Sequence, residues 1–227
     1  MAAPFRPELF RFLEELRANN DRDWFAAHKA RYERDVRDPL LAFVRDVAGP
    51  LAGISRQVVA DPRPVGGSLF RIYRDTRFAK DKSPYKTHAA VQFRHRAGKD
   101  VHAPGFYLHL EPGAVFAGAG LWRPEPSALL AVRTAIAKKP ADWTRAVGGA
   151  AFRRACALEG EMAKRPPRGF DREHPRVDDI RRKDFVAIRR FGEKDALSPH
   201  FLQAFVGFCR AAAPLNVFLC EALGQPW

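Results

Sequence analysis

The stretch THAAVQFRH, Thr87–His95, followed after a loop by FYLHLE, Phe106–Glu111, decides the predicted fold. In both segments apolar and polar side chains alternate, which is the pattern of a β-strand with one buried face. An antiparallel pairing with Val91 opposite Leu108 directs both apolar faces to the same side of a sheet. The sequence therefore predicts a β-hairpin with one polar face, which carries His88, Arg94, Tyr107, His109 and Glu111.

Segments on both sides of this hairpin complete the predicted fold. Small residues from Ala114 to Gly120 and an alternating run from Phe185 to Phe191 predict further strands. We expect an α+β protein, in which an antiparallel sheet of about five strands has N- and C-terminal helices packed on it. The expected single domain, residues 1–227, consists of N-terminal helices at 7–52, a sheet core at 57–122 plus 184–191, and helices at 125–158 and 198–223.

The composition is that of a globular protein with an excess of positive charge. Of the 227 residues 46% are hydrophobic, and 39 lysines and arginines against 26 acidic residues give a net charge of +13. A surface of this kind attracts phosphates, nucleic acids or acidic membranes. The alternative is a basic surface that only contacts solvent.

The termini and the cysteines indicate the compartment. The N-terminus lacks the uninterrupted apolar region of a signal peptide, and no apolar run approaches the roughly 20 residues that span a bilayer. We therefore expect a cytoplasmic protein without a membrane partner. Cys156, Cys209 and Cys220 are odd in number and widely spaced in apolar helical contexts, so we expect reduced, packed thiols rather than a disulfide framework.

The segment RIYRDTRFAKDKSPYKTH, Arg71–His88, is the strongest functional signal, and we call it the basic stretch. It places six lysines and arginines beside only two carboxylates and threads aromatic rings between them, and it contains the Ser83-Pro84 turn signal. Such guanidinium and ammonium groups suit an oxyanion. With His109 from the hairpin, the predicted ligand-binding residues are Arg71, Tyr73, Arg74, Arg77, Phe78, Lys82, Tyr85, Lys86 and His109.

Three residues are candidates for catalytic roles as acid or base: Asp75, His88 and Glu111. Asp75 either orients the neighbouring arginines through salt bridges, the favoured interpretation, or acts as a catalytic carboxylate. For His88 opposite Glu111 the favoured interpretation is a structural, hydrogen-bonded histidine, and the alternative is an oriented general base. His88, His109 and Glu111 together also form a two-histidine, one-carboxylate set of the kind that holds a divalent metal, but strand histidines are more often hydrogen-bonded, and we assign no metal ligand.

The arrangement Arg-x-x-Arg-Asp-x-Arg-Phe followed by Lys-x-x-Tyr-Lys, from Arg71 to Lys86, resembles the bacterial domain-of-unknown-function 2461 family. The resemblance extends over nearly the whole chain and includes the segments GFYLHLEPG, AGAGLWRPEP and KRPPRGFDREHP. It implies one domain with its function centred on the matched residues, and it implies neither an activity nor a cofactor.

Two functional hypotheses follow, and the sequence leaves open whether the protein is an enzyme. The first is recognition of an anionic, phosphate-bearing ligand, a nucleotide or nucleic acid, by the basic, aromatic-lined site. The second is an enzyme that acts on an anionic small molecule with Asp75, His88, His109 or Glu111 as acid, base or metal ligands. A third class, a structural protein with a basic partner surface, predicts no pocket. No glycine-rich phosphate loop, Ser-His-Asp order or Cys-x-x-Cys pair supports an NTPase, hydrolase or redox protein.

Overall fold

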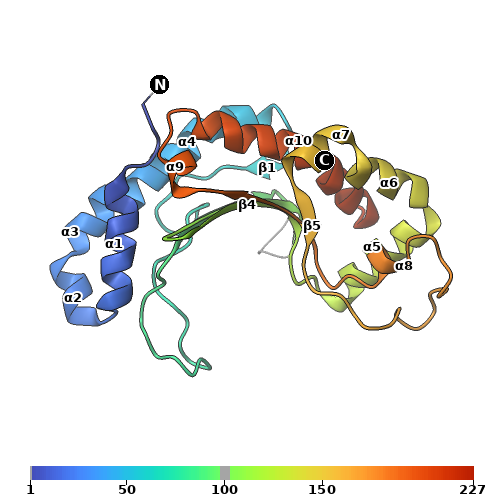
Figure 1. Cartoon of the computed structure of the whole chain (residues 1–227), viewed down its shortest axis with the longest axis horizontal. Helices are drawn as coiled ribbons and strands as arrows, with labels where there is room; N and C mark the ends of the chain where they lie inside the picture. Colours follow the sequence, from blue (N-terminus) through green and yellow to red (C-terminus); the bar gives the residue numbers. More distant parts are fainter. Residues whose placement is uncertain (1, 98–102) are drawn as a thin grey trace.

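A curved six-stranded antiparallel sheet forms the centre of the computed structural model, which describes residues 2–97 and 103–227 (Figure 1). The strand order is β1-β2-β3-β4-β6-β5, so that the central strands β2, β3 and β4 follow one another along the chain. The strands are β1 (Val58–Val59), β2 (Ala89–His95), β3 (Gly105–Glu111), β4 (Ala114–Leu121), β5 (Ala157–Glu159) and β6 (Phe185–Phe191).

The predicted hairpin is confirmed in its register. Val91 lies opposite Leu108 and Gln92 lies opposite Tyr107, so the apolar side chains of both strands share one face. Gly113 follows β3 with a φ of +80°, the left-handed conformation that glycine adopts without a Cβ penalty, and the chain turns there into β4. The alternation of apolar and polar residues therefore determines which side chains of the hairpin are buried in the core and which lie on the opposite face of the sheet.

Helices cover the convex face of the sheet, and two helical groups extend beyond its ends (Figure 1). The long helix α10 crosses the convex face and contacts β4, α6 and α4. The N-terminal group is α1 (Pro7–Ala18), α2 (Arg22–Ala27), α3 (Lys29–Tyr32), η1 (Glu33–Arg37) and α4 (Asp38–Ala52). The other helices are α5 (Pro126–Lys138), α6 (Pro140–Gly148), α7 (Ala150–Ala155), α8 (Val177–Ile180), α9 (Glu193–Ala196) and α10 (Phe201–Ala222).

Two groups of buried side chains hold these layers together. The larger one joins the N-terminal helices, the sheet and the first half of α10, where the Phe205 ring lies 5.7 Å from that of Phe93. The smaller one is centred on Trp143, whose ring packs edge-on against Phe185 and Phe218. Because α10 contributes to both groups, it fixes the convex side and leaves the concave side of the sheet free for other contacts.

The fold class is confirmed, and the differences lie at short elements. The predicted helical segment 125–158 ends at Ala155, and Ala157–Glu159 form β5, the sixth strand. A strand of three residues carries too little alternation to be recognised from sequence. The alternating segment 69–73 forms no strand, only two isolated bridges, Leu69 to Val91 and Tyr73 to Tyr85.

Helix α10 is long and apolar enough, by length and composition, to cross a membrane. This is weak evidence, because half of the apolar window is buried in the structure and a core helix of a globular protein passes the same test. Its buried side chains include Phe201, Phe205 and Leu219. These side chains belong to the cores beneath the helix, which covers the convex face of the sheet.

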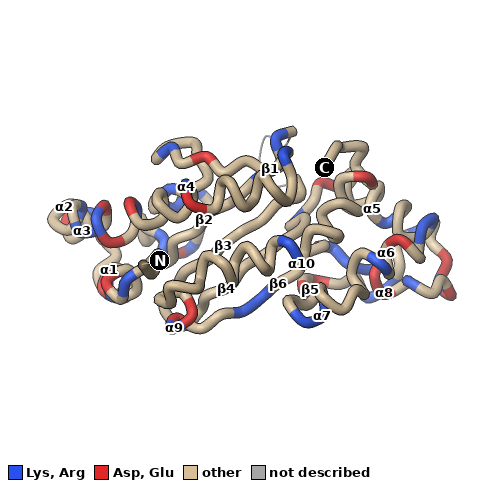
Figure 2. The backbone as a smooth tube through the Cα atoms, turned by 90° about the horizontal axis from the view of Figure 1, so that it is seen from above, with Lys and Arg blue, Asp and Glu red and all other residues tan. Residues whose placement is uncertain are grey.

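Lysines and arginines are distributed over both helical groups and over β6, and α10 is nearly free of charge (Figure 2). Arg210 is the single basic residue within α10. The net charge is thus a property of the whole surface as well as of the basic stretch, and it does not by itself locate a ligand.

Candidate functional site

The concave face of the sheet carries the polar side chains that the alternation predicts. Ala90 lies opposite His109 and Gln92 opposite Tyr107 across the hairpin, and Tyr107 in turn lies opposite Gly118 of β4. Each position is fixed by a buried neighbour on the other face, such as Val91 or Leu108. His88, Tyr107 and His109 therefore share one face, as predicted.

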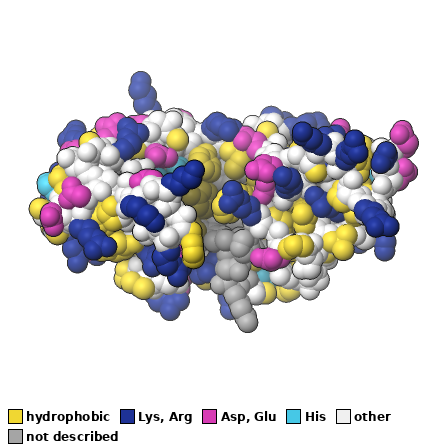
Figure 3. Space-filling model, turned by 90° about the horizontal axis from the view of Figure 1, so that it is seen from below, with side chains coloured by type: hydrophobic (Ala, Val, Ile, Leu, Met, Phe, Trp, Pro, Cys, Tyr) yellow, Lys and Arg dark blue, Asp and Glu magenta, His cyan; other side chains and the backbone are white. Residues whose placement is uncertain are grey.

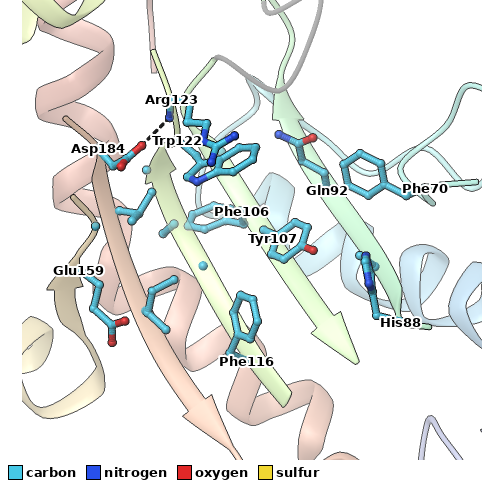
Figure 4. A pocket seen from close by; sticks show the side chains of 18 of the residues that line it. Phe70, His88, Gln92, Phe106, Tyr107, Phe116, Trp122, Arg123, Glu159 and Asp184 are labelled. Carbon is cyan, nitrogen blue, oxygen red and sulfur yellow. Dashed lines mark hydrogen bonds between the residues drawn. The ribbon is translucent and has the colours of Figure 1, made fainter. Parts of the chain in front are cut away.

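A cavity of about 700 Å³ lies on this face, and we call it the concave cavity. Apolar and aromatic side chains dominate its wall, and hydrophobic side chains gather in the hollow between the two flanks of the molecule (Figures 3 and 4). Its volume is that of a site for a small molecule. The residues that line it include Phe70, Lys86, His88, Gln92, Phe106, Tyr107, Phe116, Gly118, Gly120, Trp122, Arg123, Glu159, Glu161, Asp184, Val186 and Ile188.

Glycines in β4 make room for the cavity. A Cβ atom at Gly118 would meet Ile188 and Tyr107 at ordinary van der Waals distances, so a small side chain fits there and its absence widens the cavity. Gly120 has a φ of +120°, and its Cα lies against the backbone of Phe185, where a Cβ would come within 2.0 Å of the carbonyl oxygen. Gly118 therefore shapes the cavity, whereas Gly120 is required for the pairing of β4 with β6.

The carboxylates of the cavity wall already have partners. Asp184 is buried and accepts hydrogen bonds from the backbone N–H groups of Arg123, at 2.7 Å, and Glu161, at 3.3 Å. The side chain of Glu161 pairs with Lys183 at 3.1 Å, and that of Glu159 pairs with Arg190. These acidic groups are thus engaged with protein donors.

The two cations of the wall each lie over an aromatic ring. The Arg123 guanidinium is 4.7 Å from the ring centre of Trp122, and the Lys86 ammonium is 5.8 Å from that of Phe70. Lys86 donates a hydrogen bond of 2.6 Å to the carbonyl oxygen of Arg71, and burial lowers the pKa of its ammonium group. Within residues 2–97 and 103–227, no carboxylate forms an ion pair with either cation.

Arg123 is held in an unusual backbone conformation. Its φ of +45° lies in the left-handed region, which is costly for a residue with a side chain. The hydrogen bond from its N–H to Asp184 fixes this conformation, and the guanidinium turns back over the cavity (Figure 4). Strain that a buried carboxylate maintains is typical of functional positions.

A chain of polar groups lies at the end of the cavity where His88 is found. The Tyr107 hydroxyl is 3.0 Å from His109 Nδ1, and His109 Nε2 is 3.2 Å from Glu111 Oε2. Thr87 donates to the other Glu111 oxygen at 3.1 Å, and the His88 ring lies 4.5 Å from that of His109. Burial, with a smaller effect of His109, lowers the pKa of His88 to about 4, and burial also lowers the pKa of His109.

The basic stretch neutralises much of its charge locally. Arg74 pairs with Asp81, Arg77 pairs with Asp75, and Lys82 donates to the carbonyl oxygen of Thr76. The hydrogen bonds from Arg77 hold the pKa of Asp75 to about 2, below its usual range. Asp75 is exposed and does not line the concave cavity, which agrees with the favoured role of orienting an arginine.

The aromatic residues of the basic stretch have three different environments. Tyr85 is buried and stacks on Phe25 with ring centres 4.1 Å apart, so it belongs to the core. Tyr73 is half exposed, and Phe78 is 95% exposed with Arg77 packed beside its ring. Of the predicted ligand-binding residues, only Lys86 lines the concave cavity, while Arg71, Arg74, Arg77, Phe78 and Lys82 lie outside its wall.

Comparison with known proteins identifies the chain. The model of the conserved hypothetical protein family DUF2461 matches residues 8–218, which includes the whole sheet and both flanks of the cavity. The protein is a member of DUF2461. No curated protein matches the chain at a significant level. The concave cavity of this DUF2461 protein must therefore be interpreted from its own residues.

The sequence signals for several cavity residues of the DUF2461 chain were weak. Trp122 and Arg123 directly follow strand β4. Their position at the end of a strand is the feature of the sequence that could have indicated a place in the site. Glu159 lies in β5, a strand that the sequence did not predict, and Asp184 begins the predicted sheet segment 184–191 directly before β6. Only the topology brings these segments to the face that His88 and Tyr107 also share.

The three thiols of the DUF2461 chain are free, as predicted, and we expect them to react slowly. Burial raises the pKa of Cys156 to about 11 and that of Cys220 to about 12, and it raises that of Cys209 as well. Since the thiolate is the nucleophile, labelling by a disulfide reagent at pH 8 should be slow in the native protein and prompt for all three thiols in denaturant. A native thiol that reacts as fast as a denatured one would contradict this expectation.

Proposed function

We propose that the protein binds an anionic, phosphate-bearing small molecule with a planar ring, such as a nucleotide, in the concave cavity. The observation that carries the proposal is the pair of cations, Lys86 and Arg123, on an aromatic wall whose carboxylates are engaged elsewhere. Guanidinium and ammonium groups bind phosphate oxygens, and aromatic rings stack on a planar base.

The position of the two cations defines the shape of the ligand. Lys86 precedes β2, whose first residue pairs with the end of β3, whereas Arg123 follows β4 at the opposite end of the ladder. Tyr107 lies opposite Gly118 in the middle of the β3–β4 ladder, between these two ends, and both residues line the cavity. An elongated ligand with its anionic group at one end and its ring over this wall matches that arrangement.

A thermal-shift series tests this proposal with ATP, a dinucleotide, inorganic phosphate and a short single-stranded oligonucleotide as probes. A ligand at about 100 times its Kd contributes about 2.7 kcal/mol to native-state stability, which raises the Tm of a chain of this size by roughly 5–10 °C. We expect a shift with at least one nucleotide probe, and we expect Arg123→Ala and Gly118→Val to abolish it. Gly118→Val fills the open wall at a position where a side chain fits.

Arg77→Ala is the matched control, because Arg77 belongs to the basic stretch but does not line the cavity. It should leave the shift unchanged. A shift that is lost in Arg77→Ala and kept in Gly118→Val would place the ligand on the basic stretch instead. No shift with any probe would contradict the proposal.

The second candidate function is an enzyme that acts on the same ligand. The hydrogen-bonded chain of Tyr107, His109 and Glu111, with His88 in the cavity wall, favours it. A buried imidazole that a carboxylate orients is the usual arrangement of a general base or a metal ligand. Turnover of the bound probe, lost in His88→Gln, distinguishes this function from binding alone.

A further inference from the structure

The structure brings His88, His109 and Glu111 together at one end of the concave cavity. His88 precedes β2, and the other two residues lie on β3 with one residue between them, so all three are on the concave face. Each offers a ligand atom, and these atoms lie within 4.8 Å of one another. His109 is buried, whereas His88 is partly exposed and lines the cavity.

This spacing is close to that of a metal site. Metal-to-ligand bonds of 2.0–2.2 Å in a tetrahedral site place the ligand atoms roughly 3.3 Å apart. His109 Nε2 and Glu111 Oε2 already have a separation of 3.2 Å. The ring of His88 stands 4.5 Å from that of His109, so a small rotation of the His88 side chain completes the set.

The groups behind these ligands support the same function. Histidines that bind a metal almost always bond their second ring nitrogen to an oxygen, which fixes the ring orientation. The Tyr107 hydroxyl lies 3.0 Å from His109 Nδ1 and holds the ring with Nε2 toward Glu111. Thr87 holds the second oxygen of Glu111 and leaves Oε2 toward His109.

We propose that His88, His109 and Glu111 bind one first-row divalent transition ion, such as Zn²⁺ or Fe²⁺, with an open coordination position toward the concave cavity. Two imidazoles and one carboxylate form the ligand set of catalytic zinc and of non-haem iron sites. When the ion binds Nε2 of His109, the neutral ring carries its one proton on Nδ1, which donates to the Tyr107 oxygen. The open position could take an anionic group of the cavity ligand, and this part of the proposal rests on the proposed function. Metal binding itself does not depend on it.

Isothermal titration of the full-length, tag-free, chelator-treated protein with Zn²⁺ alone tests the site. We expect one ion per chain, and Co²⁺ in its place should give the visible absorption of a four- or five-coordinate site. His88→Gln and Glu111→Gln should each weaken binding at least about 100-fold, and Tyr107→Phe, which removes only the supporting hydroxyl, about 10-fold. His200→Gln, an exposed histidine before α10, is the control and should bind as the wild type does.

Circular dichroism without metal shows whether each variant is folded. If Glu111→Gln does not fold, the titration of His88→Gln and the histidine NMR spectrum of the wild type test the site instead. In that spectrum Zn²⁺ should shift the ring signals of His88 and His109 and leave the ring signal of His200 unchanged. Absence of saturable binding to the wild type, or unchanged binding in the folded ligand variants, would overturn the proposal. Because this experiment uses Zn²⁺ alone, such a result would not bear on the proposal that Lys86 and Arg123 bind a nucleotide.

Discussion

Gly120→Ala is expected to destabilise the protein by at least about 4 kcal/mol, the range of exceptional single substitutions. The added Cβ would lie 2.0 Å from the carbonyl oxygen of Phe185 and 3.2 Å from the Cα of Val186, and both contacts are with backbone that cannot rotate away. The φ of +120° is in addition a conformation that residues with side chains rarely adopt. The strand pair β4–β6 would have to separate locally, and β6 joins β5 to the other strands of the sheet.

The matched control is Gly118→Ala, on the same strand and the same face two residues earlier. A Cβ at that position makes contacts of 3.5 Å or longer, so the stability should change by less than about 1 kcal/mol. Urea denaturation followed by circular dichroism measures both variants. Equal stability of the two alanine variants would show that the close approach at Gly120 is not rigid.

Asp184→Ala should have the second largest effect, a loss of about 2–4 kcal/mol in the free energy of unfolding, because it removes two hydrogen bonds that backbone donors make to a buried carboxylate. These donors are the backbone N–H groups of Arg123 and Glu161. The substitution also releases Arg123 from its left-handed conformation, so the cation should leave its place over Trp122. The nucleotide binding that we propose for the concave cavity should therefore weaken together with stability.

Asp184→Asn and Asp178→Ala separate these contributions. The asparagine keeps one carbonyl oxygen for the N–H of Arg123, so its loss of stability should lie well below that of the alanine variant. Asp178 is 76% exposed and pairs with Arg181 at the surface, and its removal should cost less than about 1 kcal/mol. Chemical denaturation and the thermal-shift series measure stability and binding separately. An Asp184→Ala variant as stable as Asp178→Ala would contradict the role of this carboxylate.

The elements that could be predicted from the sequence are those in which one face of a strand or helix must be buried. Val91 and Leu108 are apolar and their neighbours are polar, and a shift by one residue would expose every apolar side chain of the hairpin. That condition specified the register, and with it the shared face of His88, Tyr107 and His109. The long apolar helix α10 was predictable for the same reason.

The cavity could not be derived in this way, because its wall is assembled by long-range pairing. β6 pairs with β4, and β5 pairs with β6. This pairing adds Asp184 and Glu159 to the concave face, which β2 and β3 begin. The number of lysines and arginines in the basic stretch also did not indicate how many of them lack an ion-pair partner and could bind a ligand. Arg74 and Arg77 found carboxylates seven and two residues away, which a count of charges does not reveal.

The place of α10 in the chain has a consequence for biosynthesis. The strands β2, β3 and β4 are contiguous, so they emerge from the ribosome together and can pair by local contacts. Their apolar face nevertheless packs against α10, which is translated about 80 residues after β4 ends. Throughout that interval Phe93 of the nascent sheet lacks its partner Phe205 of α10, and its ring is exposed to solvent or to whatever chaperone meets it. Ribosomes that stall before residue 201 should thus hold an aggregation-prone intermediate, and this part of translation is when the protein depends most on chaperones.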